Sequence, residues 1–151
     1  MFHISEILEI TAAEVLGPCS FYEMFKRSPV GEYQVNICHC ISCHLLGADN
    51  LLHHAEDTLG ITEGETTEDG QFSLEGVECI AACTEAPCLQ VNYRYQNKVT
   101  ASHFDELVQE IRDGKRSEIH KHGSLAKIRQ SVTKERIAGS EVIEKEKKPE
   151  W

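Results

Sequence analysis

The chain has 151 residues, 40% of them hydrophobic, which is enough for one compact domain with a buried core. Its formal charge is −10, and residues 1–114 hold 5 Lys and Arg against 19 Asp and Glu; this acidic body argues against nucleic-acid binding, because a phosphate backbone would be repelled. No apolar run reaches the roughly 20 residues that span a bilayer and no signal-peptide pattern opens the chain, so we expect a cytoplasmic protein without direct membrane insertion.

The beginning of the chain carries helix signals. Apolar residues recur there at helical spacing. Thr11 and Glu14 then form the sequence pattern of a capping box, which opens a second short helix. Gly17 and Pro18 are expected to end that helix. We therefore assign residues 1–30 to an N-terminal helical segment.

Two stretches that alternate apolar and polar residues predict strands, YQVNIC at 33–38 and FSLEGVEC at 72–79. Between them, apolar residues recur every three or four positions from Leu45 to Gly60, which predicts one amphipathic helix. An acidic, glycine-containing stretch at 61–71 predicts the loop that leads into the second strand.

A hairpin and a last helix follow. Residues 89–93 alternate again, and a turn at 96–97 leads into a second short strand. Thr100 then caps an amphipathic helix. These elements predict a mixed sheet flanked by helices, an α/β domain over residues 31–114, followed by a basic and flexible tail at 115–151.

The seven cysteines are the strongest functional signal. In a reducing compartment cysteines serve as metal ligands or redox groups more often than as disulfides, and an odd count fits a disulfide framework poorly. Two pairs follow the predicted strands: Cys38 and Cys43 with four residues between them, and Cys79 and Cys83 with three. Four thiolates are the usual ligand set of a [2Fe-2S] cluster, which this pattern favours.

Other interpretations of these residues stay open. Cys40 and Cys43 form one C-x2-C knuckle of the kind that binds zinc, completed by the later cysteines or by His39 and His44. The same C-x2-C lies after a strand and before a helix, as in a thioredoxin dithiol, but this leaves the later cysteine pair unexplained. The two histidines also suggest a Rieske-type centre, although four cysteines are already available.

Longer stretches of the sequence resemble a known family. They are ISEILEITAAEVLG, FYEMF, KRSPVGEY, the first cysteine pair, GETTEDGQFSLEGVECIAACTEAPCLQVN and the helix from Thr100. Over residues 4–114 the chain is similar to the thioredoxin-like [2Fe-2S] ferredoxin subunits of respiratory complex I, the E-type subunits of NADH-quinone oxidoreductase. The family's ligands fall on Cys38, Cys43, Cys79 and Cys83, so the resemblance implies a thioredoxin-like fold with a [2Fe-2S] cluster at these residues.

The resemblance also implies an electron-transfer subunit that has no catalytic residues of its own. Its cluster would exchange an electron with FMN in a partner flavoprotein subunit that oxidises NADH, within the peripheral arm of complex I. The chain contains neither G-x-G-x-x-G nor a P-loop, so NAD and FMN are expected in the partner. The protein would then lie in the cytoplasm, peripheral to the inner membrane through the complex.

Two alternative functions accompany this expectation. The chain could be the equivalent small subunit of an NAD(P)-reducing hydrogenase or of an NAD-dependent formate dehydrogenase, whose cluster domains look much the same. An alternative of another class is a zinc-stabilised binding module with no redox function.

The chain departs from the family pattern in two respects. Family members usually carry a further N-terminal helical stretch, so residues 1–30 are expected to be a truncated or short variant of it. Cys19, Cys40 and Cys88 occupy positions where the family mostly has other residues, and we expect small substitutes without a second redox function. Cys40 is the exception, because it lies beside the ligands and could replace one of the first pair if that thiol were lost.

Overall fold

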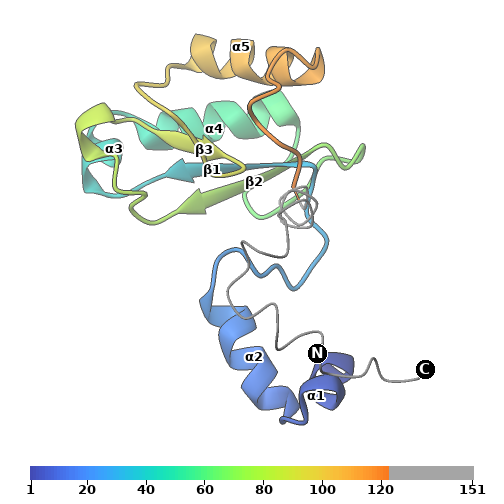
Figure 1. Ribbon diagram of the computed structural model, residues 1–151. Helices are drawn as coiled ribbons and strands as arrows, with labels where there is room; N and C mark the ends of the chain where they lie inside the picture. The colour runs from blue at the N-terminus through green and yellow to red at the C-terminus, as the bar shows by residue number, and fades with distance from the viewer. Residues whose placement is uncertain (123–151) are drawn as a thin grey trace, which may run out of the picture.

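The computed structural model describes residues 1–122 of the chain. Two helices, α1 (Phe2–Leu8) and α2 (Ala12–Phe21), precede the four-stranded sheet and its helices. In Figure 1 this helical pair projects away from the sheet. Residues 123–151, which make up most of the predicted tail, lie outside the described residues.

Helix α2 begins where the sequence predicts and ends later. The N–H of Glu14 donates to the hydroxyl of Thr11 at 3.2 Å and the N–H of Thr11 donates to the carboxylate of Glu14 at 2.8 Å, which completes the predicted capping box. The expectation that Gly17 and Pro18 end the helix is wrong, because it continues to Phe21. Pro18 lies inside the helix, where it has no N–H to donate.

The sheet has the strand order β2-β1-β3-β4. β1 (Tyr33–Cys38) pairs in parallel with β2 (Phe72–Val77) and antiparallel with β3 (Leu89–Val91), which continues through a hairpin into β4 (Arg94–Gln96). β1 lies between β2 and β3, and all of its residues are buried. This mixed sheet confirms the predicted α/β class.

Helices α4 (Ala48–Leu59) and α5 (Ala101–Arg112) lie together over one face of the sheet (Figure 1). Thr100 caps α5 as predicted, and its hydroxyl accepts the N–H of His103. The apolar sides of both helices pack against the sheet in a single core. Its members from the helices and strands are Leu51, Ala55, Leu59, Phe104, Leu107, Val108 and Ile111 on the helices, and Tyr33, Val35, Ile37, Phe72, Leu74, Leu89 and Val91 on the strands.

Two predicted elements are shifted. The helix expected from Leu45 to Gly60 is α4, which begins later because Gly47 adopts a left-handed conformation with φ 94° and separates it from a short helix, α3 (Ile41–Leu45). The expected hairpin turn at 96–97 is also wrong. The turn lies at Asn92 and Tyr93, both with positive φ, as the tight two-residue hairpin turn requires.

The chain after α5 stays attached to the sheet domain. The side chain of Ile119 is 2% exposed and joins the core. The amide of Asn92 donates to the carbonyl of His120 at 2.7 Å, and the N–H of His122 donates to the carbonyl of Glu32 at 2.7 Å. The first part of the predicted tail therefore belongs to the packed structure.

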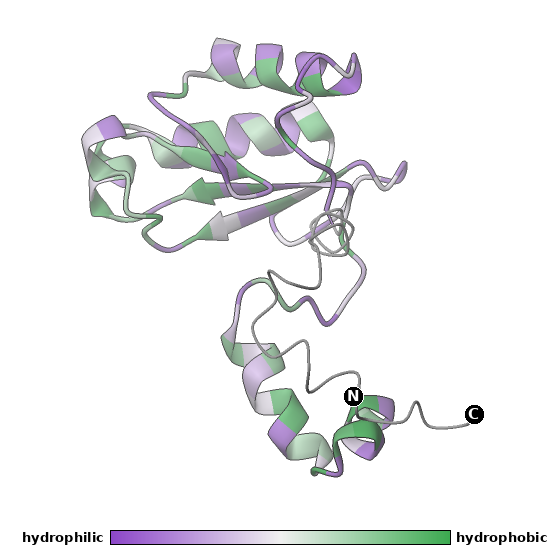
Figure 2. Ribbon diagram, viewed as in Figure 1, coloured by the Kyte–Doolittle hydropathy of each residue, from purple (hydrophilic) through white to green (hydrophobic). Residues whose placement is uncertain are grey.

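The helical pair presents apolar side chains to solvent. Figure 2 shows hydrophobic residues along α1 and α2, and Phe2, Leu8 and Phe21 are each more than half exposed. A patch of this kind is typical of a surface that contacts another protein. None of the helices within residues 1–122 is long and apolar enough to cross a membrane.

Candidate metal centre

The four predicted ligands lie at one edge of the sheet, at or beyond the C-terminal ends of β1 and β2. The strands run in parallel register from Tyr33 opposite Phe72 to Cys38 opposite Val77, so both strands end at the same edge. The N–H of His39 donates to the carbonyl of Val77 at 3.1 Å, which continues the pairing past the end of β1. The two cysteine-bearing loops therefore start side by side.

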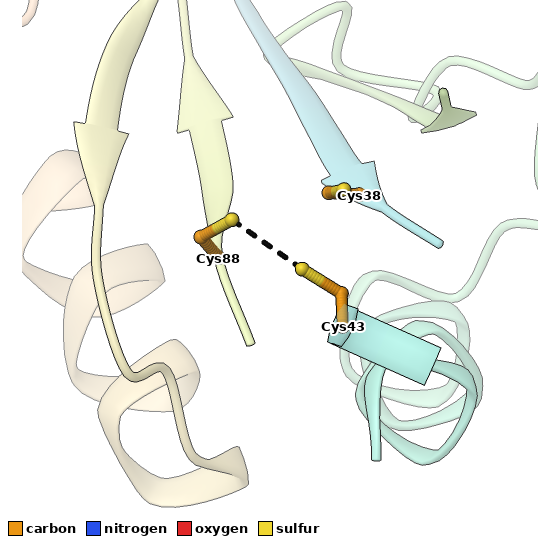
Figure 3. A group of neighbouring side chains, drawn as sticks. All are labelled: Cys38, Cys43 and Cys88. Carbon is orange, nitrogen blue, oxygen red and sulfur yellow. Dashed lines mark hydrogen bonds between the residues drawn. The ribbon is translucent and has the colours of Figure 1, made fainter. Parts of the chain in front are cut away.

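The first ligand pair is buried and has a neighbour. Cys38 ends β1, Cys43 lies in α3, and each side chain is 1% exposed. Their sulfurs and that of Cys88 all lie within 4.8 Å of one another. In Figure 3 the side chains of Cys43 and Cys88 point toward each other, and their Sγ atoms are 3.5 Å apart. The end of β1, helix α3 and the residue before β3 thus bring three thiols into one buried group.

Strand register explains the position of Cys88. Leu89 lies opposite Ile37 in the antiparallel pairing of β1 with β3. One step further along the ladder, the N–H of Cys38 donates to the carbonyl of Cys88 at 3.2 Å. Residues directly opposite each other in an antiparallel pair project their side chains to the same face, so Cys88 is placed beside Cys38.

The second ligand pair is exposed. Cys79 follows β2, and Cys83 begins the short 3-10 helix η1 (Cys83–Glu85), with 3.6 Å between the two Sγ atoms. The N–H of Ala81 donates to the sulfur of Cys79 at 3.4 Å. Backbone N–H groups aimed at sulfur stabilise negative charge there, as they do around iron-sulfur clusters.

The pKa shifts of the thiols have different causes in the buried group and on the exposed loop. Burial raises the pKa of Cys43, and the N–H and thiol of Cys88 partly offset the rise. Burial also raises the pKa of Cys88 to about 12, with the sulfur of Cys43 as the next cause. On the exposed loop, the hydrogen bond from Ala81 lowers the pKa of Cys79, whereas the hydrogen bond with Cys79 raises that of Cys83.

Smaller contacts connect the exposed pair to the first loop. The side chain of Ser42 and the charge of Cys43 both influence the ionisation of Cys83, and the thiol of Cys40 influences that of Cys79. The structure brings together the thiols within each predicted pair, but the thiols that all lie within 4.8 Å of one another are Cys38, Cys43 and Cys88, without Cys79 or Cys83. Metal ligation by thiols displaces their protons, so binding here would weaken as pH falls.

The donor set fits a [2Fe-2S] cluster. Four thiols are present in two pairs, and the sulfurs within each pair are close enough to share one metal ion: 3.6 Å separates Cys79 from Cys83, and Cys38 and Cys43 lie within 4.8 Å. Four cysteine thiolates are the standard ligands of such a cluster. The buried side of the site belongs to the core, and the exposed side faces solvent.

The two histidines near the thiols are both exposed. The ring nitrogen Nδ1 of His44 lies 2.9 Å from the carboxylate of Asp49, and the His44 side chain is 55% exposed. His39 is also exposed. The group of potential metal ligands found within residues 1–122 contains three cysteines and no histidine. The geometry thus gives no support to a Rieske-type or a histidine-completed zinc centre.

The remaining cysteines differ in their distance from the site. Cys40 contributes to lowering the pKa of Cys79, so it lies near the second ligand pair. Cys19 lies in α2, in the helical pair that projects away from the sheet (Figure 1). Cys88 has no role in the predicted ligand set, yet its sulfur lies in direct contact with that of Cys43.

Most of the chain is similar to known proteins. The family model for the thioredoxin-like [2Fe-2S] ferredoxin matches residues 1–112. The chain is 39% identical over 113 residues to an NADH-quinone oxidoreductase subunit of Rhizobium meliloti, covering 75% of this chain and 67% of that protein. It is 40% identical over 116 residues to NADH-quinone oxidoreductase subunit 2 of Thermus thermophilus, covering 76% of this chain and 64% of that protein.

A solved structure shares the fold. The NAD+-reducing [NiFe]-hydrogenase in its H2-reduced state superposes with a TM-score of 0.65 at 23% sequence identity, over 74% of this chain and 19% of the hydrogenase chain. At this identity the likeness concerns the fold alone. The chain spans about two thirds of the length of its Rhizobium meliloti and Thermus thermophilus relatives.

Proposed function

Because the chain belongs to the thioredoxin-like [2Fe-2S] ferredoxin family, we propose that it is an electron-transfer subunit of an NADH-quinone oxidoreductase. It would bind one [2Fe-2S] cluster and exchange an electron with FMN in a partner flavoprotein subunit. The observation that carries the proposal is that two close thiol pairs follow the parallel strands β1 and β2 at the same edge of the sheet. The relatives that are named as subunits of this oxidoreductase support the biological context.

Each thiol pair has a defined role in this proposal. Cys38 and Cys43 would hold one iron, and Cys79 and Cys83 would hold the other. The bound cluster supplies storage of one electron at a time. The N–H of Ala81 donates to the sulfur of Cys79, where it offsets the negative charge that accumulates on reduction. The burial of the first pair keeps water away from that side of the site.

An apolar surface beside the thiols suits a protein partner. Helix α3 and the residue after it expose Ile41, Leu45 and Leu46, with 66%, 74% and 60% of their surfaces accessible. Cys43 lies on the same short helix, facing the other way into the core. A flavoprotein subunit docked on this apolar surface would exclude water and approach the cluster closely. NAD and FMN would bind in that partner, because the chain has no nucleotide-binding motif.

The first experiment is metal and sulfide analysis of the anaerobically purified full chain, with EPR spectra before and after dithionite. We expect about two irons and two acid-labile sulfides per chain, with an EPR signal that appears on reduction. Stoichiometric zinc without a reducible signal would overturn the proposal in favour of a zinc-stabilised binding module.

A second measurement addresses the partner. With the flavoprotein subunit of the same oxidoreductase present, NADH should reduce the cluster in an anaerobic mixture, whereas NADH alone should not. Failure of the flavoprotein to transmit electrons from NADH would contradict the proposed position in the complex. The other subunits of the native complex distinguish the alternative functions. Quinone-reducing membrane subunits would favour the NADH-quinone oxidoreductase, whereas a hydrogenase or formate dehydrogenase subunit would make this chain the small subunit of one of those enzymes.

A further inference from the structure

We propose that Cys88 is a positioning residue for the cluster: its thiol donates a hydrogen bond to the sulfur of Cys43 and so raises the reduction potential. The inference rests on the proposed function, since it takes Cys43 as an iron ligand. It assigns a role to a cysteine that lies outside the four predicted ligands and that the electron-transfer proposal does not use.

The geometry of the contact supports a hydrogen bond. The Sγ atoms of Cys43 and Cys88 are 3.5 Å apart, within the range of a sulfur hydrogen bond, and the two side chains point toward each other in Figure 3. Cys88 is held in this place by the sheet, because its carbonyl accepts the N–H of Cys38 at 3.2 Å. The thiol therefore occupies a fixed position on the ladder beside β1.

The direction of the hydrogen bond follows from the ligand role. An iron ligand is a thiolate and has no proton to give, so the proton between the two sulfurs belongs to Cys88. The side chain of Cys88 is 1% exposed, so water does not compete for its thiol. Its surroundings are small apolar residues, among them Ala48 and Ala86. A neutral thiol is the form of cysteine that such a site accommodates.

The effect on the cluster is electrostatic. Reduction adds negative charge that spreads onto the ligand sulfurs, and hydrogen bonds to those sulfurs stabilise the reduced state. The buried, low-dielectric setting strengthens the contact relative to one in water. Cys88 is not required as a ligand, because Cys38, Cys43, Cys79 and Cys83 already supply two thiolates for each iron. It acts on the cluster through Cys43.

The test compares Cys88→Ala with Cys88→Ser in the anaerobically purified full chain. We expect both variants to keep the wild-type content of iron and sulfide. The potential measured by spectroelectrochemical titration should move to a more negative value in Cys88→Ala, while Cys88→Ser, which retains a donor, should stay closer to wild type. Cys19→Ala is the matched control, because it removes a thiol from α2 and should leave the potential unchanged.

A second readout detects the proton itself. Pulsed electron-nuclear double resonance of the reduced protein, prepared in H2O or in D2O, should show an exchangeable proton coupled to the cluster. This proton signal should be missing in Cys88→Ala. Should that variant fail to fold, Cys88→Val removes the donor while filling the space. An unchanged potential and an unchanged proton signal in the donor-free variant would overturn the inference.

Two other results would overturn either the donor role of Cys88 or the proposed function. Loss of iron and sulfide from both Cys88→Ala and Cys88→Ser would mean that Cys88 is a ligand and not a hydrogen-bond donor. Wild-type protein without a [2Fe-2S] cluster would instead overturn the proposed function, whatever the variants do. The wild-type metal analysis thus distinguishes failure of the inference from failure of the function on which it rests.

Discussion

Exposure divides the four proposed ligands into an inner and an outer pair. Cys38 and Cys43 are built into the core, whereas Cys79 and Cys83 lie on an exposed loop after β2. Replacing an inner thiol changes both metal binding and packing. Replacing an outer thiol changes metal binding and leaves the core intact. The outer pair therefore gives the cleaner test of the ligand assignment.

Cys83→Ser should remove or alter the cluster without unfolding the protein. Replacing a residue that only contacts a metal ligand lowers metal affinity roughly tenfold to hundredfold. Loss of a ligand itself should lower the iron affinity by more than this, and the visible and EPR spectra should bleach or shift. Far-UV circular dichroism should stay as in wild type, and the free energy of unfolding of the apo chain in urea should change by less than about 0.5 kcal/mol, because the site is exposed. Cys19→Ser serves as the control, and a wild-type spectrum in Cys83→Ser would contradict the assignment.

Ala81 holds the exposed loop in a conformation that favours glycine. Its φ is 62°, in the left-handed region, and its N–H donates to the sulfur of Cys79. The left-handed conformation costs a residue with a Cβ roughly 1–2 kcal/mol. Ala81→Gly should therefore stabilise the loop and slow the loss of iron to a chelator. Ala82→Gly is the matched control, because Ala82 has φ −116° and no such strain to relieve; equal effects of the two substitutions would refute this account.

At the scale of elements, local sequence patterns account for most of the fold. The capping box at Thr11, the alternation in β1 and the cap at Thr100 each involve residues within a few positions of one another, and each prediction is confirmed. The break at Gly47 is also local, because a glycine with positive φ separates the two helices. The turn at Asn92 carries no N-G or D-G signal, so the sequence pattern did not place it.

The same limit explains the part of the site that the sequence did not predict. Spacing and family resemblance select the four ligands, because these lie in recognisable pairs along the chain. Cys88 enters the site only through the register that sets Leu89 opposite Ile37. Because the hairpin turn was expected at 96–97, the sequence did not predict which residues of β1 and β3 pair. Nothing in the sequence therefore placed Cys88 beside Cys38 and Cys43.

Gly47 separates the helix that carries Cys43 from the helix that packs on the sheet. Its φ of 94° lets α3 and α4 meet at a sharp turn. A Cβ at this position would have room, since its nearest neighbour atom is 4.0 Å away on Asn50, so the cost of a substitution is conformational. Gly47→Ala should lower the free energy of unfolding by about 1 kcal/mol or more. It should also hasten cluster loss, because α3 positions Cys43.

Gly17→Ala is the control for this prediction, because it makes the same exchange of residues at a glycine whose φ is not positive. Gly17 lies inside α2, without a positive φ and with nothing near its missing Cβ. Gly17→Ala should therefore favour the helix by roughly 0.5–1 kcal/mol. Urea unfolding and the rate of iron release measure both variants. If Gly47→Ala proved as harmless as Gly17→Ala, the break between α3 and α4 would not depend on glycine.

For the whole molecule, the four proposed ligands and the chain after α5 lie at different parts of the sheet domain. The metal centre occupies the edge where β1 and β2 end, and the segment after α5 returns along the sheet to Glu32, beside the start of β1. The main core includes Ile119, beyond the end of the predicted domain at residue 114, whereas the buried thiols belong to a second, smaller cluster. The body of the protein thus needs part of the segment that composition alone assigns to the tail.

Ile119→Ala should destabilise the sheet domain, because it empties a fully enclosed position. Core Ile→Ala changes cost about 2–5 kcal/mol, and Ile119 is 2% exposed. Ile7→Ala is the matched control, since Ile7 is 51% exposed and its loss should cost less than about 0.5 kcal/mol. Urea unfolding of the holo chain measures both.

A chain that ends at residue 122 should keep its cluster and its stability, whereas one that ends at residue 114 should lose stability as Ile119→Ala does, because the same side chain is missing from the core. Equal stability of the two shortened chains would show that Ile119 contributes nothing to the fold.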